Sequence, residues 1–76
     1  MNEEQEKAFE PFAKKAKEKN VHLNMCLWAT AAVLNSNNWK DVLDDIIRLI
    51  EESKDGDDFA MRLLKKYPGQ KVAPEA

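Results

Sequence analysis

Apolar residues recur at helical spacing from the start of the chain, which predicts a first helix between Asn2 and Asn20. Asn2 followed by Gln5 has the pattern of a capping box, and Asn20 is a suitable stop. Pro11 interrupts the apolar stripe. Because proline removes a backbone hydrogen bond and clashes with the preceding turn, we expect a kink or a restart there. The stripe consists of Ala8, Phe9, Phe12, Ala13 and Ala16.

Residues 21–35 carry two competing patterns. Apolar and polar residues alternate from residue 21 to residue 28, which is typical of a strand, but Leu23, Leu27 and Leu34 belong to a helical row. No second strand candidate is present, and a lone strand would leave its backbone unpaired. We therefore predict a helix over residues 22–35. Because it is apolar nearly all round, we expect it to be buried from several sides.

Two further helices are predicted after the polar turn of residues 35–38. The third begins at Asn38, carries two adjacent apolar rows, and ends at Gly56, which suits the left-handed position after a helix. The fourth is capped by Asp55 or Asp57 and ends before Pro68. The sequence thus predicts an all-α fold, a small bundle of three to four short helices over residues 1–69, followed by a disordered tail over residues 70–76.

The apolar content exceeds what so short a chain is expected to bury. Twenty-one large apolar or aromatic side chains lie between Phe9 and Tyr67 in a chain of 76 residues, and small domains have thin cores. A two-fold interface is the commonest way to cover such a surplus, so we predict a homodimer. The predicted interface residues are Leu27, Trp28, Leu34, Ile46, Ile47 and Ile50.

Charge is sorted along the chain, whose net charge is −2. Residues 40–58 hold eight acidic and three basic side chains. These acids either coat a solvated face or dock onto a basic surface of a partner protein, where electrostatics speeds and orients association. Tryptophan is frequent at interaction hot spots. The residues predicted to bind the partner are Trp39, Asp41, Asp44, Asp45, Glu51 and Glu52.

A basic patch supports an alternative, a nucleic-acid-associated transcriptional regulator. The patch comprises Lys14, Lys15, Lys17 and Lys19. Nucleic-acid binders usually have a strongly basic face, whereas this chain has a sequence pI of about 5.3. The acids of the third helix would also be repelled by a DNA backbone, so nucleic-acid binding is the less favoured reading.

Candidate chemistry is sparse. His22 and Cys26 have the spacing of a thiolate–imidazole pair on a helix, but a small buried hydrophobe beside an exposed histidine is the favoured interpretation of Cys26. A zinc site would need further ligands. Asp55 opens a pattern similar to a calcium loop, but its twelfth position is Lys66 instead of a glutamate. We therefore predict a protein without catalysis, metal or cofactor.

The single cysteine, Cys26, cannot form an internal disulfide, which points to a reducing compartment. Residues 20–39 carry no charge but are interrupted by asparagines, too often for a membrane span, and the N-terminal residues are acidic, unlike a secretory signal. We predict a cytoplasmic protein without membrane contact. The favoured function is a small protein–protein interaction protein, an inhibitor, adaptor or regulator of the kind found among bacterial and phage accessory proteins.

Overall fold

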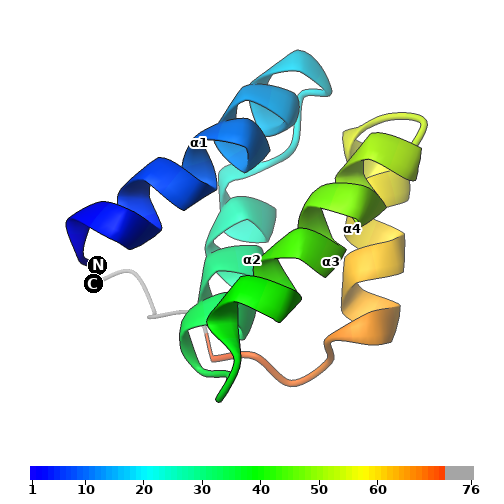
Figure 1. Ribbon diagram of the computed structural model, residues 1–76. Coiled ribbons are helices and arrows are strands. Elements are labelled where there is room, and N and C mark those ends of the chain that lie inside the picture. The colour runs from blue at the N-terminus through cyan, green and yellow to red at the C-terminus, as the bar shows by residue number, and fades with distance from the viewer. Residues whose placement is uncertain (72–76) are drawn as a thin grey trace, which may run out of the picture.

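The fold is organised around one helix that packs against the other three. The computed structural model describes residues 1–71, and these residues form helices and connecting turns without a strand, which confirms the all-α prediction. The helices are α1 (Glu3–Glu18), α2 (Leu23–Leu34), α3 (Trp39–Glu52) and α4 (Gly56–Lys66). α3 packs against α1, α2 and α4, as Figure 1 shows. Most of the predicted tail, residues 72–76, lies outside the described residues.

The core lies where all four helices meet. Its largest fully buried side chains are Val33, Ile46, Ile50, Phe59 and Leu63. The ring of Phe12 from α1 packs on that of Phe59, with centroids 5.9 Å apart. Each such side chain contributes about 1.5–3 kcal/mol on burial, so this cluster is the main source of the fold's stability.

α1 is continuous through Pro11, so the predicted restart is wrong. Pro11 is exposed, whereas Phe9, Phe12 and Ala16 are buried on the other side of the helix. The carbonyl that loses its bond belongs to Lys7, an exposed residue, and can face water instead. Tertiary burial of the phenylalanines therefore outweighs the proline. The capping box of Asn2 and Gln5 is confirmed.

The predicted stop at Asn20 is confirmed, and it has the geometry of a Schellman motif. Asn20 has φ 57°, in the left-handed region that asparagine tolerates better than most residues. The N–H of Val21 donates to the carbonyl of Ala16 at 2.9 Å, and the N–H of Asn20 to that of Lys17 at 3.4 Å. This motif turns the chain sharply from α1 into α2.

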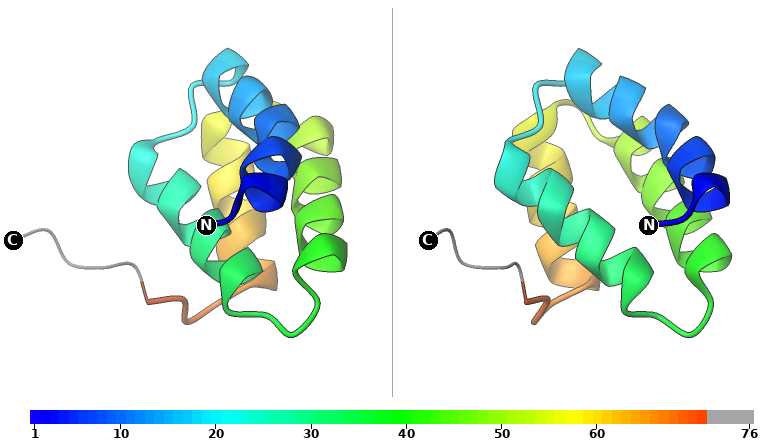
Figure 2. Two further views of the ribbon diagram at one scale, coloured as in Figure 1. Left: turned by 60° about the vertical axis from the view of Figure 1, so that its left-hand side comes forward. Right: turned by 90° about the vertical axis from the view of Figure 1, so that its left-hand side faces the viewer.

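α2 forms as predicted, within one residue at each end, but it is not buried from several sides. Only its Ala29, Ala32 and Val33 are buried. Leu23 and Leu34 remain exposed, at 68% and 41%. α2 packs on α3 with its small side chains, and Figure 2 shows α1 and α2 diverging from their shared turn, so that α1 does not cover the outer side of α2.

The prediction that Gly56 ends the third helix is wrong. α3 ends at Glu52 with Ser53 as its C-cap, and Gly56 is the buried first residue of α4, capped by Asp55 as one of the two predicted alternatives. A Cβ atom on Gly56 would lie 2.5 Å from the carbonyl oxygen of Asn20. Glycine is required at this position because the two turns approach each other closely. A left-handed backbone conformation is not the reason.

Lys19 fastens the same two turns together. Its Nζ donates to the carbonyls of Ile50 at 2.7 Å, Glu51 at 3.1 Å and Ser53 at 2.5 Å. α3 has no basic residue in its own last turn, so the cation that favours a helix C-terminus comes from the end of α1. Figure 2 shows the α1–α2 and α3–α4 turns at one end of the molecule.

We predict that Lys19→Met lowers the free energy of unfolding by about 2 kcal/mol, because partly buried carbonyls lose charged donors. Urea denaturation followed by circular dichroism measures this loss. Lys14→Met is the matched control, since Lys14 is exposed on the same helix, and it is expected to stay within about 0.5 kcal/mol of wild type. Equal stability of the two variants would contradict the capping role.

We predict that Gly56→Ala destabilises the protein by about 2–3 kcal/mol, although alanine normally favours a helix over glycine. The added methyl group meets backbone atoms, which cannot rotate away as a side chain can. Gly69→Ala is the comparison: nothing lies within 4 Å of its added Cβ, so only its φ of 75° opposes the change. If the Gly56→Ala variant melted at the same temperature as wild type, the close approach of Gly56 to the Asn20 carbonyl would be refuted.

Candidate functional site

A groove of about 330 Å³ lies between α1 and α3 and brings together three of the predicted interaction residues. Trp39, Asp44 and Ile47 line it from α3. The remaining lining residues are Glu4, Ala8, Pro11, Lys40 and Leu43. The groove therefore combines an apolar surface and an indole ring with carboxylates from both helices.

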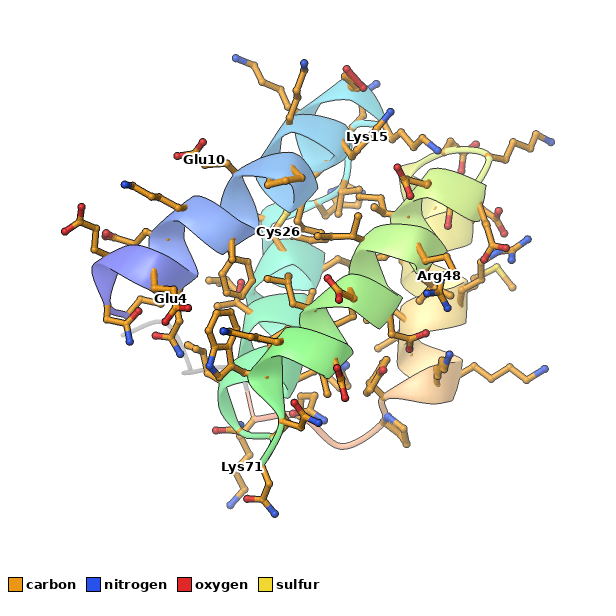
Figure 3. The ribbon with its side chains drawn as sticks, viewed as in Figure 1. Glu4, Glu10, Lys15, Cys26, Arg48 and Lys71 are labelled. Atoms are coloured by element: carbon orange, nitrogen blue, oxygen red, sulfur yellow. The ribbon has the colours of Figure 1, made fainter. Side chains whose placement is uncertain are left out.

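Lys40 shows which kind of group this groove accommodates. Its Nζ lies 3.1 Å from Oε2 of Glu4 and 5.6 Å from the centroid of the Trp39 ring. Both side chains of the ion pair are 65% exposed, so the pair contributes little to stability and can exchange readily. A cation over an indole beside a carboxylate is a recognition geometry for basic side chains. Figure 3 shows Glu4 on the side of α1 that faces this part of α3, and Glu10 on the side facing away.

The other predicted acids are spread along α3. Asp41 is exposed, and its Oδ2 accepts a hydrogen bond from the Asn38 side chain at 2.6 Å. Glu51 and Glu52 are exposed at the C-terminal end of α3, about 20 Å along the axis from Trp39. The acids thus form a long exposed edge and only Asp44 among them lines the groove.

Asp45 differs from its neighbour Asp44, because it is bonded within the chain. It accepts a hydrogen bond from Lys66 Nζ at 2.8 Å and another from the Tyr67 hydroxyl. The Tyr67 carbonyl in turn accepts a hydrogen bond from Trp28 Nε1 at 2.7 Å. These bonds join α2, α3 and the end of α4. The polar groups of the Asp45 and Trp28 side chains are therefore used within the fold.

The pKa values of Asp45 and Tyr67 move in opposite directions. Burial alone would raise the pKa of Asp45, but the hydrogen bonds from Lys66 and Tyr67 and the Lys66 charge outweigh it and lower that pKa. Burial, followed by the hydrogen bond to the Asp45 carboxylate and its charge, raises the pKa of Tyr67 to about 12. The pair is therefore a neutral phenol donating to a carboxylate over the ordinary pH range.

The predicted dimer residues differ in how far they are exposed. Ile46 and Ile50 have no exposed surface, so a second copy could reach them only by opening the core. Trp28 and Ile47 are half-buried. Leu27 and Leu34 are 38% and 41% exposed, so a second copy could contact these two residues without any change in the core.

A larger groove, about 410 Å³, lies between α1 and α2 and was missed by the sequence analysis. Its walls are almost entirely apolar, and Lys17 has the only charged side chain among the lining residues, which also include Met1. The sequence pattern assigned Phe9, Phe12 and Ala16 to the core, and they do reach it, but their outer edges also line this groove. The absence of charge over residues 20–39 is the signal that could have indicated it.

Cys26 lies half-buried in this groove, and its thiol is not activated. Burial raises the pKa of Cys26, which opposes formation of the thiolate that a nucleophile requires. His22 is exposed at the N-cap of α2 and its side chain makes no capping bond. Within residues 1–71, no group of three or more His, Cys, Asp or Glu side chains is placed to hold a metal ion.

The members of the predicted basic patch have different surroundings. Lys19 is bonded to α3, and Lys15 lies 3.7 Å from Glu18. Lys14 and Lys17 are the exposed members.

Comparison with protein families, curated proteins and solved structures finds no match to this chain. Among the described residues, no helix is both long enough and apolar enough to cross a membrane.

We predict that Tyr67 stabilises the fold at neutral pH and loses this effect in strong alkali. Its folded pKa of about 12 lies above the model-peptide value of 10.0. The contribution is therefore complete below pH 10 and is lost as the pH rises toward about 12. Partial exposure limits it to about 1 kcal/mol. Tyr67 is the only tyrosine of the chain, so phenolate absorbance reports its pKa directly.

The matching variant is Tyr67→Phe. It should be less stable than wild type at pH 7 by about 1 kcal/mol, and the difference should shrink above pH 10. A wild-type absorbance titration with a midpoint near 10 would show that Asp45 and burial do not hold the proton.

Proposed function

We propose that this protein acts without catalysis by binding another protein, as an inhibitor, adaptor or regulator, through the α1–α3 groove and the acidic edge of α3. The observation that carries the proposal is the placement of Lys40 over Trp39 and beside Glu4. The chain's own cation occupies a place that a basic side chain of a partner can take, because the exposed ion pair costs little to separate.

The groove favours a partner that offers both a cation and apolar contact. Trp39 and Asp44 supply an aromatic face and a carboxylate, while Pro11 and Ile47 offer apolar surface to the stem of a long basic side chain. An arginine fits this combination better than a lysine does, since its planar guanidinium stacks on indole and pairs with carboxylates. The partner in this proposal therefore has a basic surface with an arginine at its centre.

The remaining acids extend this surface along α3. Asp41, Glu51 and Glu52 are exposed, and they lie outside the groove at either end of the helix. Charges at the rim of an interface act mainly on the rate and orientation of association. We assign them to steering, and Trp39 with Asp44 to contact.

We further propose that the protein is cytoplasmic and forms a homodimer. The free Cys26 suits a reducing compartment. The leucines that α2 leaves exposed support self-association. A nucleic-acid role has less support, because Lys19 is bonded to three carbonyls within the chain.

We predict that Asp44→Lys weakens binding of a short arginine–leucine peptide by at least about tenfold, because the groove loses an attractive charge and gains a repulsive one. Titration followed by two-dimensional NMR measures the affinity and locates the contact at Trp39. The same peptide with citrulline in place of arginine removes the charge at similar shape and should bind weakly to wild type.

Glu10→Lys is the matched control, since it changes the net charge equally on the side of α1 away from α3 (Figure 3). Its affinity should stay within about threefold of wild type, because exposed charges outside the contact are largely screened. If both variants weakened peptide binding equally, the effect would come from net charge alone, and the groove would be refuted as the binding site. A short DNA duplex that binds wild type, and binds Asp44→Lys more tightly, would favour the nucleic-acid alternative.

A further inference from the structure

α2 presents an exposed row of leucines directly beside the α1–α2 groove. Leu23, Leu27 and Leu34 follow one another at helical spacing and are 68%, 38% and 41% exposed. Leu23 also lines the groove, together with Cys26 and Thr30 from the same helix. The ridge and the groove are therefore two parts of one continuous apolar surface.

The opposite wall of the groove comes from α1 and leaves room for inserted side chains. Phe9 and Phe12 line it, and Ala13 and Ala16 add only methyl groups. Figure 2 shows the two helices separating from their common turn, and the Cys26 label in Figure 3 marks the α2 wall. A volume of about 410 Å³ lies within the range of sites that enclose drug-sized groups, so several side chains can enter.

The absence of charge selects the occupant. Residues 20–39 contain no Asp, Glu, Lys or Arg, and the only charged side chain on the other wall is that of Lys17, whose stem can extend to solvent. A strongly charged partner would leave its charge desolvated and unpaired on this surface. The leucine row of α2 has the uncharged, ridged character that the groove requires.

We infer that a second copy of this chain occupies the groove, inserting its Leu23–Leu27–Leu34 row between α1 and α2 while its own groove receives the same row in return. A ridge and a groove that adjoin on one surface satisfy a two-fold, isologous contact, in which each copy contributes both parts. The inference rests on the homodimer of the proposed function, and it moves the interface from α2 and α3 to α2 and α1.

This arrangement leaves the α1–α3 groove open. Glu4, Ala8 and Pro11 line that groove, whereas Ala13 and Ala16 line the groove between α1 and α2. A dimer formed through α2 would therefore carry two free copies of the basic-partner site. Two linked sites increase the apparent affinity for a partner with repeated basic segments, provided that the spacing matches.

Analytical ultracentrifugation tests the dimer. Wild type should sediment at twice the monomer mass of 8.7 kDa, and Leu27→Glu should weaken self-association by at least about 100-fold, because each interface gains two unpaired charges. Leu64→Glu is the control: this leucine on α4 is 41% exposed, like Leu34, but lines neither groove, and its dimer constant should match wild type.

Ala13→Glu tests the groove side of the same contact. Ala13 is exposed in the single chain, so this variant should fold as wild type does, with an unchanged thermal melt, and it should also sediment as a monomer. Cys26 localises the contact because it is the only cysteine and lies in the groove. Its alkylation by iodoacetamide should slow by about tenfold or more when wild type is concentrated from the monomer to the dimer range, and should not slow in Leu27→Glu.

Three outcomes overturn the inference: a wild type that stays monomeric at about 1 mM, a dimer that Leu27→Glu and Ala13→Glu leave intact, and a dimer whose Cys26 reacts as fast as in the monomer. The arginine–leucine peptide separates this result from the proposed function. If monomeric Leu27→Glu still binds the peptide at its single-site affinity, the partner site stands without the dimer; if a stable dimer fails to bind the peptide, the dimer stands without the partner site.

Discussion

The buried core supplies most of the stability, but the placement of α1 and α2 relative to α3 depends on the contact between the Lys19 ammonium and the carbonyls at the end of α3. This contact holds the α1–α2 turn against the α3–α4 turn, where Gly56 allows the Asn20 carbonyl to approach closely. Because the two turns are held together at this end, α1 and α2 diverge from their shared turn, and each packs separately on α3. Different bonds close the opposite end of the molecule. Trp28 Nε1 donates to the Tyr67 carbonyl and the Tyr67 hydroxyl donates to Asp45, and neither bond involves α1.

α1 is consequently held to the rest of the fold along one side only. Phe9, Phe12 and Ala16 reach the core from this side, and the exposed Glu4–Lys40 pair is a further contact with α3 toward the start of α1. A helix attached in this way has a groove on each flank, which explains why so small a chain presents concave surfaces at all. The apolar surplus of the sequence is distributed unevenly. α3 buries Leu43, Ile46 and Ile50, whereas α4 buries Phe59 and Leu63 but exposes Met61 and Leu64, and α2 keeps a leucine row at the surface.

The local features could be predicted from sequence because they depend on neighbouring residues. The capping box at Asn2, the stop at Asn20 and the cap at Asp55 each need only a few consecutive positions. Gly56 could not, since its role comes from a turn more than thirty residues away in the chain. Likewise Asp44 and Asp45 are adjacent in sequence but lie about 100° apart around α3, and the position of α4 decides that Asp45 is bonded to Lys66 while Asp44 lines the groove.

The two flanks of α1 differ in chemistry, and this difference follows from the sequence of one helix. Glu4, Ala8 and Pro11 face a groove with carboxylates and an indole, whereas Ala13 and Ala16 face a groove that is almost free of charge. A basic segment placed in the uncharged groove would lose its hydration without gaining a counter-charge, and a leucine row placed in the acidic groove would desolvate Asp44 and Glu4. Each groove thus rejects the occupant that suits the other, so that self-association and partner binding can occur on one small helix without competing.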